Sequence, residues 1–395
     1  SSSPCIISPY TLSPYSYGFI PSLCTITFDE RAKDNVVQAS KYCFLRDNAV
    51  LSTEARSAPS ANLNPDRGLS LPFYGYLPRQ ERGTEPPPPH RLCRLAEGDN
   101  APVPTSATAI SPSTEATYLQ YVRSARLPPQ TVDLGGGAKG HWLGDRNAKK
   151  VLIWYHGGGF CLPASMAYFN FFEQLIVSTR TAGHDLAVFV LSYTLVPHAQ
   201  YPRQLVQAIE ALQYIVTETH RGPGDVLVGG DSAGGNLAVG VLSHLSHCHP
   251  AIPNLKLDQP LAGVVLLSPW TSLELIPTGS SNNIGDLITT QVAGPWSSGY
   301  LGDNDRDYYT DASTAPSTWF ENALTTNILV LGGGNEIMRP MIEHFVQKVK
   351  LGFPSVELFF GEREAHVAPV FNLYVGSKTE TEQGMKLKEW LKKLL

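Results

Sequence analysis

Two short glycine-rich segments of this 395-residue chain carry the residue types that acyl transfer needs. The segment HGGG, at 156–159, follows an apolar run and offers consecutive backbone N–H groups that no side chain blocks. The segment GDSAG, at 230–234, matches the G-x-S-x-G pattern, which places a serine on a strained turn between a strand and a helix. We therefore predict Ser232 as a nucleophile, with Gly157, Gly158 and Ala233 as donors to an oxyanion.

A serine hydroxyl needs a general base, and the base needs an orienting carboxylate. On a parallel sheet with such a serine turn, the order along the chain is serine, acid and histidine. Glu336 lies just beyond a predicted strand at 327–331, and His366 lies just beyond another at 356–360. Because ligands bind at the carboxyl ends of parallel strands, both side chains are expected near Ser232. The predicted catalytic residues are thus Ser232, Glu336 and His366.

Each of these residues also has a plainer interpretation. A glycine-rich turn capped by Ser or Asp would account for the GDSAG segment alone. Glu336 could be a solvated loop residue, and His366 a loop histidine satisfied by its neighbours. HGGG could be a flexible loop or a phosphate cradle, although no Gly-Lys-Ser/Thr follows it as in a nucleotide-binding loop. The presence of all the parts in the expected order favours the catalytic interpretation.

Beyond about residue 139, apolar strand-like runs alternate with helical patterns, which indicates a parallel sheet flanked by helices. Near-continuous Val, Leu and Ile runs are typical of strands buried on both faces. The predicted strands cover 151–155, 186–193, 226–229, 263–267, 327–331 and 356–360, and the predicted helices cover 166–181, about 205–216, 233–246, 338–350 and 380–394. The fold class is therefore α/β, with a mostly parallel central sheet.

Proline divides the chain into two regions. Seventeen of its 31 prolines lie within residues 1–130, including four in succession at 86–89. Such density disfavours regular layers, so we assign 1–115 to a Pro-rich N-terminal or cap region and 116–395 to a catalytic domain. Residues 271–325 are rich in Gly, Ser, Asn and Asp and interrupt the alternation. They are predicted to form an insertion above the sheet.

Composition limits the partners. The net charge of −5 and the lack of Lys/Arg-rich runs give no reason to expect nucleic acid or an anionic membrane as a partner. Residues 1–28 carry no charge, but four prolines interrupt them, so no spanning helix or stable membrane insertion is expected. They also lack the basic segment of a signal peptide. We expect a cytoplasmic protein that acts on a small-molecule ester; the pattern leaves the oligomeric state open.

Cysteines and histidines do not predict a metal or a disulfide framework. Four of the six cysteines lie within the first 93 residues, where one or two bridges would fit, but six in a chain of this length do not form a framework. His244, His247, Cys248 and His249 lack a second ligand pair at zinc-site spacing. No metal or other cofactor is therefore expected.

Taken together, these segments resemble the hormone-sensitive-lipase-like branch of the α/β-hydrolases, the fold-3 esterases and lipases. The resemblance extends to GDSAGGNL at 230–237, to the Tyr-x-Leu-x-Pro pattern within 193–202, and to Ser-Pro-Trp at 268–270. It departs where Glu336 begins EIMRP in place of the usual Asp-Pro-Leu-Arg-Asp, and where His366 begins HVA in place of His-Gly-Phe. The residue patterns at 140–145 and 195–197 are similar to those of fungal members, several of which act in specialised metabolism.

The resemblance implies an α/β-hydrolase fold, a serine carboxylesterase activity, and a cap made from residues 1–115 and 271–325. It also suggests Phe160 and Trp270 as walls of the substrate pocket, although buried aromatic residues are more often simply core. A lactonase, a thioesterase or an acyltransferase would use the same residues. A ligand-binding protein on a hydrolase scaffold, as among plant hormone receptors, would be marked by loss of the base, whereas His366 is present. A secreted or membrane-attached lipase is a further alternative.

Overall fold

The structure is a computed structural model that describes residues 25–27, 43–44, 70–72, 111–274 and 286–395. Within the first 110 residues it describes three short strands, β1 (Thr25–Thr27), β2 (Cys43–Phe44) and β3 (Ser70–Pro72). These strands pair antiparallel in the order β2-β1-β3. Most of the predicted cap region, and the side chains of its four cysteines, therefore lie outside the described residues.

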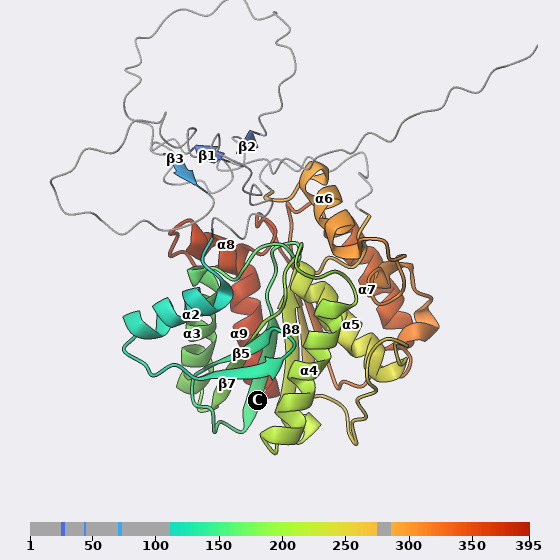
Figure 1. Ribbon diagram of the computed structural model, residues 1–395, viewed down its shortest axis with the longest axis horizontal. Coiled ribbons are helices and arrows are strands. Elements are labelled where there is room, and N and C mark those ends of the chain that lie inside the picture. The colour runs from blue at the N-terminus through green and yellow to red at the C-terminus, as the bar shows by residue number, and fades with distance from the viewer. Residues whose placement is uncertain (1–24, 28–42, 45–69, 73–110, 275–285) are drawn as a thin grey trace, which may run out of the picture.

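An eight-stranded sheet forms the centre of the domain (Figure 1). Its strands are β4 (Thr131–Gly135), β5 (Ala138–Leu143), β6 (Lys150–Tyr155), β7 (Leu186–Ser192), β8 (Val226–Asp231), β9 (Gly263–Leu267), β10 (Ile328–Gly333) and β11 (Val356–Gly361). They lie in the order β11-β10-β9-β8-β6-β7-β5-β4. The six strands β6 to β11 run parallel, and β4 and β5 are antiparallel to their neighbours. The predicted, mostly parallel α/β sheet is confirmed, with all six predicted strands.

Helices cover both faces of this sheet. They are α2 (Thr114–Ser124), α3 (Met166–Thr181), α4 (Arg203–Glu218), α5 (Ala233–Ser246), α6 (Thr290–Leu301), α7 (Arg339–Gly352), α8 (Ala368–Tyr374) and α9 (Glu382–Leu394), with 3₁₀ turns η3 (Pro223–Asp225), η4 (Ala312–Thr314) and η5 (Ser317–Phe320). Figure 1 shows α4, α5 and α7 on one side of the sheet and α2, α3 and α9 on the other. The five predicted helices correspond to α3, α4, α5, α7 and α9.

The alternation of side chains along β6 explains why two hydrophobic cores form. Val151 and Ile153 point into the core beneath α4 and α5, whereas Leu152 and Trp154 point into the core beneath α3 and α9. All four are fully buried. Since successive residues of a strand face opposite sides, only a continuous apolar run can fill both cores at once. This is the physical basis of the near-continuous apolar runs in the sequence.

Five helices and strands of this domain were not predicted. The β4–β5 hairpin lies at the edge of the sheet, and β4 is only partly buried, so its sequence is not an apolar run. Helix α2 lies at the end of the Pro-rich region, α8 has seven residues, and α6 contains Pro295. Each of these segments lacks the long apolar period that identifies a helix from sequence.

Among the described residues, no helix combines the length and the hydropathy that a membrane span requires.

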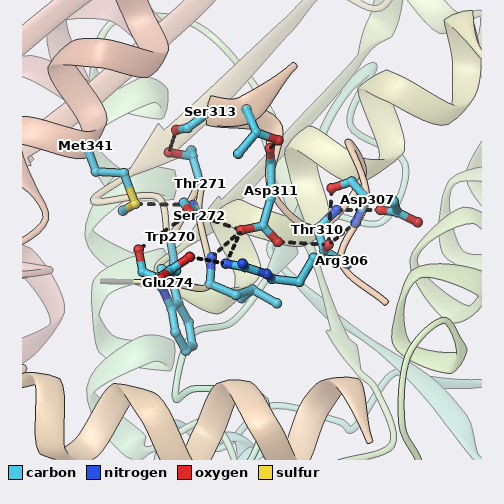
Figure 2. A network of polar contacts seen from close by, with 12 residues as sticks. Trp270, Thr271, Ser272, Glu274, Arg306, Asp307, Thr310, Asp311, Ser313 and Met341 are labelled. Atoms are coloured by element: carbon cyan, nitrogen blue, oxygen red, sulfur yellow. Dashed lines mark hydrogen bonds and ion pairs between the residues drawn. The ribbon is translucent and has the colours of Figure 1, made fainter. Parts of the chain in front are cut away.

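Between β9 and β10 the chain leaves the sheet for the segment that contains α6, η4 and η5. Figure 2 shows a polar network within this segment, centred on the buried carboxylate of Asp311. Asp311 accepts hydrogen bonds from the Leu273 N–H (2.9 Å) and from the Ser272 and Thr310 hydroxyls (3.0 Å each), and it lies 3.6 Å from Arg306. These contacts join the start of the segment, at 272–273, to its later part at 306–311.

Asn236 of α5 anchors the same segment to the helix that follows Ser232. Its side-chain amide donates to the carbonyls of Trp270 (2.8 Å) and Thr310 (2.6 Å) in a buried environment. We expect Asn236→Ala to lower the free energy of unfolding by about 1–3 kcal/mol, because two buried carbonyls lose their donor. Denaturant unfolding measures this loss. The exposed Asn147→Ala is the control and should stay within about 0.5 kcal/mol of wild type; equal stability of the two variants would contradict the anchoring role.

Candidate active site

Ser232 occupies the turn between β8 and α5. Its backbone has φ 53° and ψ −117°, a conformation that costs about 1–3 kcal/mol and persists only where the surroundings hold it. The Ser232 N–H donates to the Leu267 carbonyl, and the Ser232 carbonyl accepts from the Trp270 N–H, both at 3.0 Å. A Cβ at Gly234 would overlap the carbonyl oxygen of Tyr155, so the glycine allows α5 to approach β6. The structure therefore has the strained turn that the GDSAG pattern predicts.

Three other non-glycine residues around this turn share a left-handed backbone. Phe160, Ser268 and Val367 have φ values of 62°, 46° and 52°. Phe160 follows the HGGG segment, Ser268 follows β9, and Val367 follows His366. Strained residues of this kind gather at functional sites, where the surrounding structure maintains them. Backbone strain is thus concentrated where the sequence predicts chemistry.

Glu336 and His366 meet although 30 positions separate them. His366 Nδ1 lies 2.8 Å from Glu336 Oε2, and Glu336 Oε1 accepts a hydrogen bond from the Gly333 N–H at 3.2 Å. Both residues are buried, with 2% of Glu336 and 3% of His366 exposed. His366 Nε2, on the other side of the ring, has no hydrogen-bond partner among the described residues. The imidazole is therefore held at one nitrogen and free to exchange a proton at the other.

The charges around the imidazole favour its protonated form. Burial by itself would lower the pKa of His366, but the hydrogen bond and charge of Glu336, with Asp286 and Asp231 behind it, outweigh burial and raise the pKa. Burial raises the pKa of Glu336, and the bond with His366 opposes that rise. A raised imidazole pKa makes His366 a stronger proton acceptor at neutral pH.

Ser232 is not hydrogen-bonded to His366 in the structure. Ser232 is 5% exposed and follows the carboxyl end of β8. His366 lies in the loop that follows the carboxyl end of the parallel strand β11. Contacts between a nucleophile and its base often tighten only when substrate is bound, so their absence does not argue against the pair. The structure therefore brings Glu336 and His366 together, and it shows no hydrogen bond between Ser232 and His366.

The structure contradicts the prediction for Gly157. The Gly157 N–H donates to the Tyr168 hydroxyl and to Asp231 Oδ1, each at 3.1 Å, so it is not available to an oxyanion. The N–H groups of Gly158 and Gly159, and that of Ala233 at the start of α5, donate to no group in the described part of the chain. The free donors in the glycine segment are therefore one position further along than predicted.

Asp231 is the reason why Gly157 is occupied. Its carboxylate also accepts hydrogen bonds from the Trp154 indole N–H (2.9 Å) and the Tyr168 hydroxyl (2.6 Å). Burial raises the pKa of Asp231 to about 6, although these donors lower it. Asp231, next to Ser232, thus holds the glycine segment against β8. Sequence reasoning assigned it no role, because only the fold shows which donors face it.

The two aromatic residues predicted as pocket walls are both buried in the structure, and their role as walls stays a prediction. Phe160 is fully buried and stacks on Tyr300 with ring centroids 3.6 Å apart, and Trp270 is 1% exposed. Trp296 of α6 instead contacts the glycine segment, because a Cβ at Gly159 would overlap its indole ring. This half-buried tryptophan belongs to residues 271–325, which the sequence predicts only as a polar insertion. No motif in the sequence indicated that Trp296 would contact the glycine segment.

Two further polar residues lie next to Glu336 and His366. The Ser268 hydroxyl accepts a hydrogen bond from the Val367 N–H (3.1 Å), and it lowers the pKa of Glu336, against the rise that burial causes. Asp286 accepts from the backbone N–H of His366 at 3.1 Å. The Ser-Pro-Trp motif was a signal for Ser268, whereas nothing in the sequence distinguishes Asp286 from other acidic residues of the insertion.

The histidines near the end of α5 serve packing and hydrogen bonding. His244 Nε2 contacts the Pro253 carbonyl (3.1 Å), and His247 stacks on Trp319 with ring centroids 3.8 Å apart. His249 Nε2 contacts the Tyr201 hydroxyl at 3.0 Å. Within the described ranges, no group of three or more His, Cys, Asp and Glu residues could hold a metal ion.

A family model described as the alpha/beta hydrolase fold matches residues 152–369, which is more than half of the chain and includes the serine turn and both loops of the acid–histidine pair. The chain belongs to the α/β-hydrolase fold family. This agrees with the parallel sheet and with the turn at Ser232.

Named relatives and solved structures are consistent with this family. Steryl acetyl hydrolase 1 of Saccharomyces cerevisiae is 30% identical over 139 residues, which are 34% of this chain and 30% of that protein. An acetyl-hydrolase of Streptomyces hygroscopicus is 29% identical over 148 residues, 37% of this chain and 45% of that protein. The matched segments thus span less than two thirds of these relatives.

Two solved structures share the fold. An esterase from the bacterial hormone-sensitive lipase family has a TM-score of 0.55 and 22% identity, over 72% of this chain and 94% of its own. Carboxyl esterase 2 from the mycorrhizal fungus Tuber melanosporum has a TM-score of 0.55 and 19% identity, over 68% of this chain and 88% of its own.

Proposed function

We propose that the chain is a serine carboxylic-ester hydrolase that works through an acyl-enzyme. The observation that carries the proposal is the buried imidazole of His366, bonded to Glu336 at Nδ1 and unpartnered at Nε2 among the described residues. The strained serine turn at the end of β8 and the free N–H groups around it add support. A hydroxyl, a base and oxyanion donors are the groups that acyl transfer requires.

In the proposed mechanism, Ser232 Oγ bonds to the ester carbonyl carbon while its proton passes to His366 Nε2. The carbonyl electron pair moves onto the oxygen, where the N–H groups of Gly158, Gly159 and Ala233 stabilise it, each by about 3 kcal/mol. Collapse of this intermediate expels the alcohol, which takes the proton from Nε2. Water then attacks the acyl-enzyme through the same base and releases the acid.

For the substrate, we propose a small to medium hydrophobic ester, with acetyl esters as the first to test. Relatives named as acetyl hydrolases support this choice. The residue patterns at 140–145 and 195–197, which resemble those of fungal members, and the likeness to a fungal esterase support a role in fungal specialised metabolism. A cytoplasmic location stays a prediction, as does the assignment of 1–115 and 271–325 to a cap.

The proposal is tested with a fluorophosphonate probe, which reacts only with an activated serine. Labelling of the full chain, followed by peptide mass spectrometry, should place one adduct on Ser232. A ligand-binding protein on the same scaffold should not react. The release of p-nitrophenol and of acetate from p-nitrophenyl acetate then separates hydrolysis from transfer, because in an acyltransferase an added alcohol or amine would take up the acetyl group and raise the release of p-nitrophenol without that of acetate. Absence of both labelling and turnover would contradict the proposal that the chain is an enzyme.

Gly159→Ala should lower kcat by about 10²-fold, because the loss of one oxyanion donor has an effect of this size. The added Cβ would overlap Trp296, and the φ of +59° is unfavourable for alanine, so the segment must shift. Steady-state kinetics on p-nitrophenyl acetate measures the loss. Gly294→Ala on α6 is the matched control, because a Cβ there meets nothing within 4 Å. Equal kcat for the two variants would contradict the assignment.

A further inference from the structure

Asp286 joins the insertion to both loops that carry the acid and the base. It lies four residues before α6 and is 8% exposed. Its Oδ1 accepts hydrogen bonds from the backbone N–H groups of Leu287 (2.8 Å) and His366 (3.1 Å), and its Oδ2 accepts from the Ile337 N–H (2.7 Å). One buried carboxylate thus contacts the backbone of the base itself and that of the residue after Glu336.

The charge of this carboxylate matters as much as its hydrogen bonds. The charged and titratable groups that face His366 are Glu336 from the loop after β10, Asp286 from the insertion and Asp231 from the end of β8. Glu336 and Asp231 have other donors that hold them, and Asp231 has no hydrogen bond to the base. Of these three carboxylates, Glu336 is hydrogen-bonded to the imidazole ring and Asp286 to the backbone N–H of His366.

We propose that Asp286 is a positioning residue for the base, which fixes the His366 backbone and stabilises the imidazolium that forms when Ser232 gives up its proton. This inference rests on the proposed function and deepens it. When the proton of Ser232 moves to Nε2, the ring gains a positive charge beside the buried carboxylate of Glu336, while the buried carboxylate of Asp286 lies against the backbone N–H of the same histidine. Because the interior screens charge weakly, the second carboxylate lowers the energy of that state. The insertion would then contribute to the chemistry as well as to covering the site.

The test compares the pH dependence of kcat/KM for p-nitrophenyl acetate in the wild type and in Asp286→Asn. Asparagine has nearly the same shape but no charge, so the imidazolium is less stable and the pKa of the base falls. We expect the acid limb of the profile to move to lower pH by about half to one pH unit. We also expect kcat to fall about tenfold with KM within about twofold. Asp286→Glu, which keeps the charge, should keep the wild-type acid limb.

Asp311→Asn is the matched control, because Asp311 is also a buried carboxylate that holds the insertion but contacts neither Glu336 nor His366. It should leave the acid limb unchanged. An acid limb in Asp286→Asn that coincides with wild type, or an equal shift in Asp311→Asn, would overturn the inference. If Asp286→Asn does not fold, Asp286→Ser, with a hydroxyl acceptor and no charge, takes its place with the same expected shift.

A second measurement separates this inference from the proposed function. The pKa of the His366 imidazole is measured by NMR in Ser232→Ala with and without Asp286→Asn, which requires no turnover. If the wild type shows neither activity nor labelling, the proposed function is contradicted. A lower His366 pKa in the Asp286→Asn variant would still support the contact between Asp286 and His366. An active wild type whose His366 pKa is unaffected by Asp286→Asn would reject the inference alone.

Discussion

Ser232→Ala is expected to lower kcat for p-nitrophenyl acetate by about 10⁵- to 10⁶-fold, to near the background rate. The hydroxyl oxygen of Ser232 is the only protein atom that forms a covalent bond to the substrate in the proposed mechanism, so its loss removes the acyl-enzyme. Water can still attack with help from the oxyanion donors, which leaves a small residual rate. Activity near the wild-type level in this variant would end the hydrolase proposal.

The fold should tolerate this change. Alanine accepts the left-handed backbone of Ser232 no worse than serine does, and the hydrogen bonds that hold the turn come from backbone groups. Thermal unfolding of Ser232→Ala should therefore match wild type within a few degrees. Ser246→Ala, on the same helix α5, is the control and should keep wild-type turnover. Loss of fluorophosphonate labelling in Ser232→Ala alone would assign the reactive serine.

Glu336→Gln is expected to lower kcat by about 10⁴-fold while the protein stays folded. Glutamine fits the same space, but its neutral amide no longer stabilises the imidazolium, and it can present its N–H₂ to His366 Nδ1. The ring would then rotate or adopt the wrong tautomer. Because the Glu336 bond and charge are the main causes that raise the pKa of His366, the acid limb of the residual rate should move to lower pH.

Two controls distinguish a chemical from a structural effect at this position. Glu336→Asp keeps the charge on a shorter side chain and should retain more activity than Glu336→Gln. Glu343→Gln on α7 removes an exposed carboxylate that pairs with Arg339 at 2.9 Å, and it should change turnover little. Equal losses in Glu336→Gln and Glu336→Asp would indicate that the site tolerates no change of shape, and they would argue against the orienting role.

The strands and helices around the site were accessible from the sequence because their signals are local. A strand buried on both faces must be apolar throughout, and α4 must place Leu205, Ile209 and Leu212 on one face. Elements with weak local signals were missed for the same reason. The β4–β5 hairpin is an edge with little apolar alternation, and α6 contains Pro295.

The sequence by itself determined the turn that carries Ser232, and the place of Ser232, Glu336 and His366 beyond the ends of parallel strands, because each depends on motif and period along the chain. The tertiary structure decided which groups remain free to act. It assigns the Gly157 N–H to Asp231 and Tyr168, and it brings Asp286 to the backbone of His366. Hydrogen bonds and charges act through space, so only the packed chain settles which donor meets which acceptor.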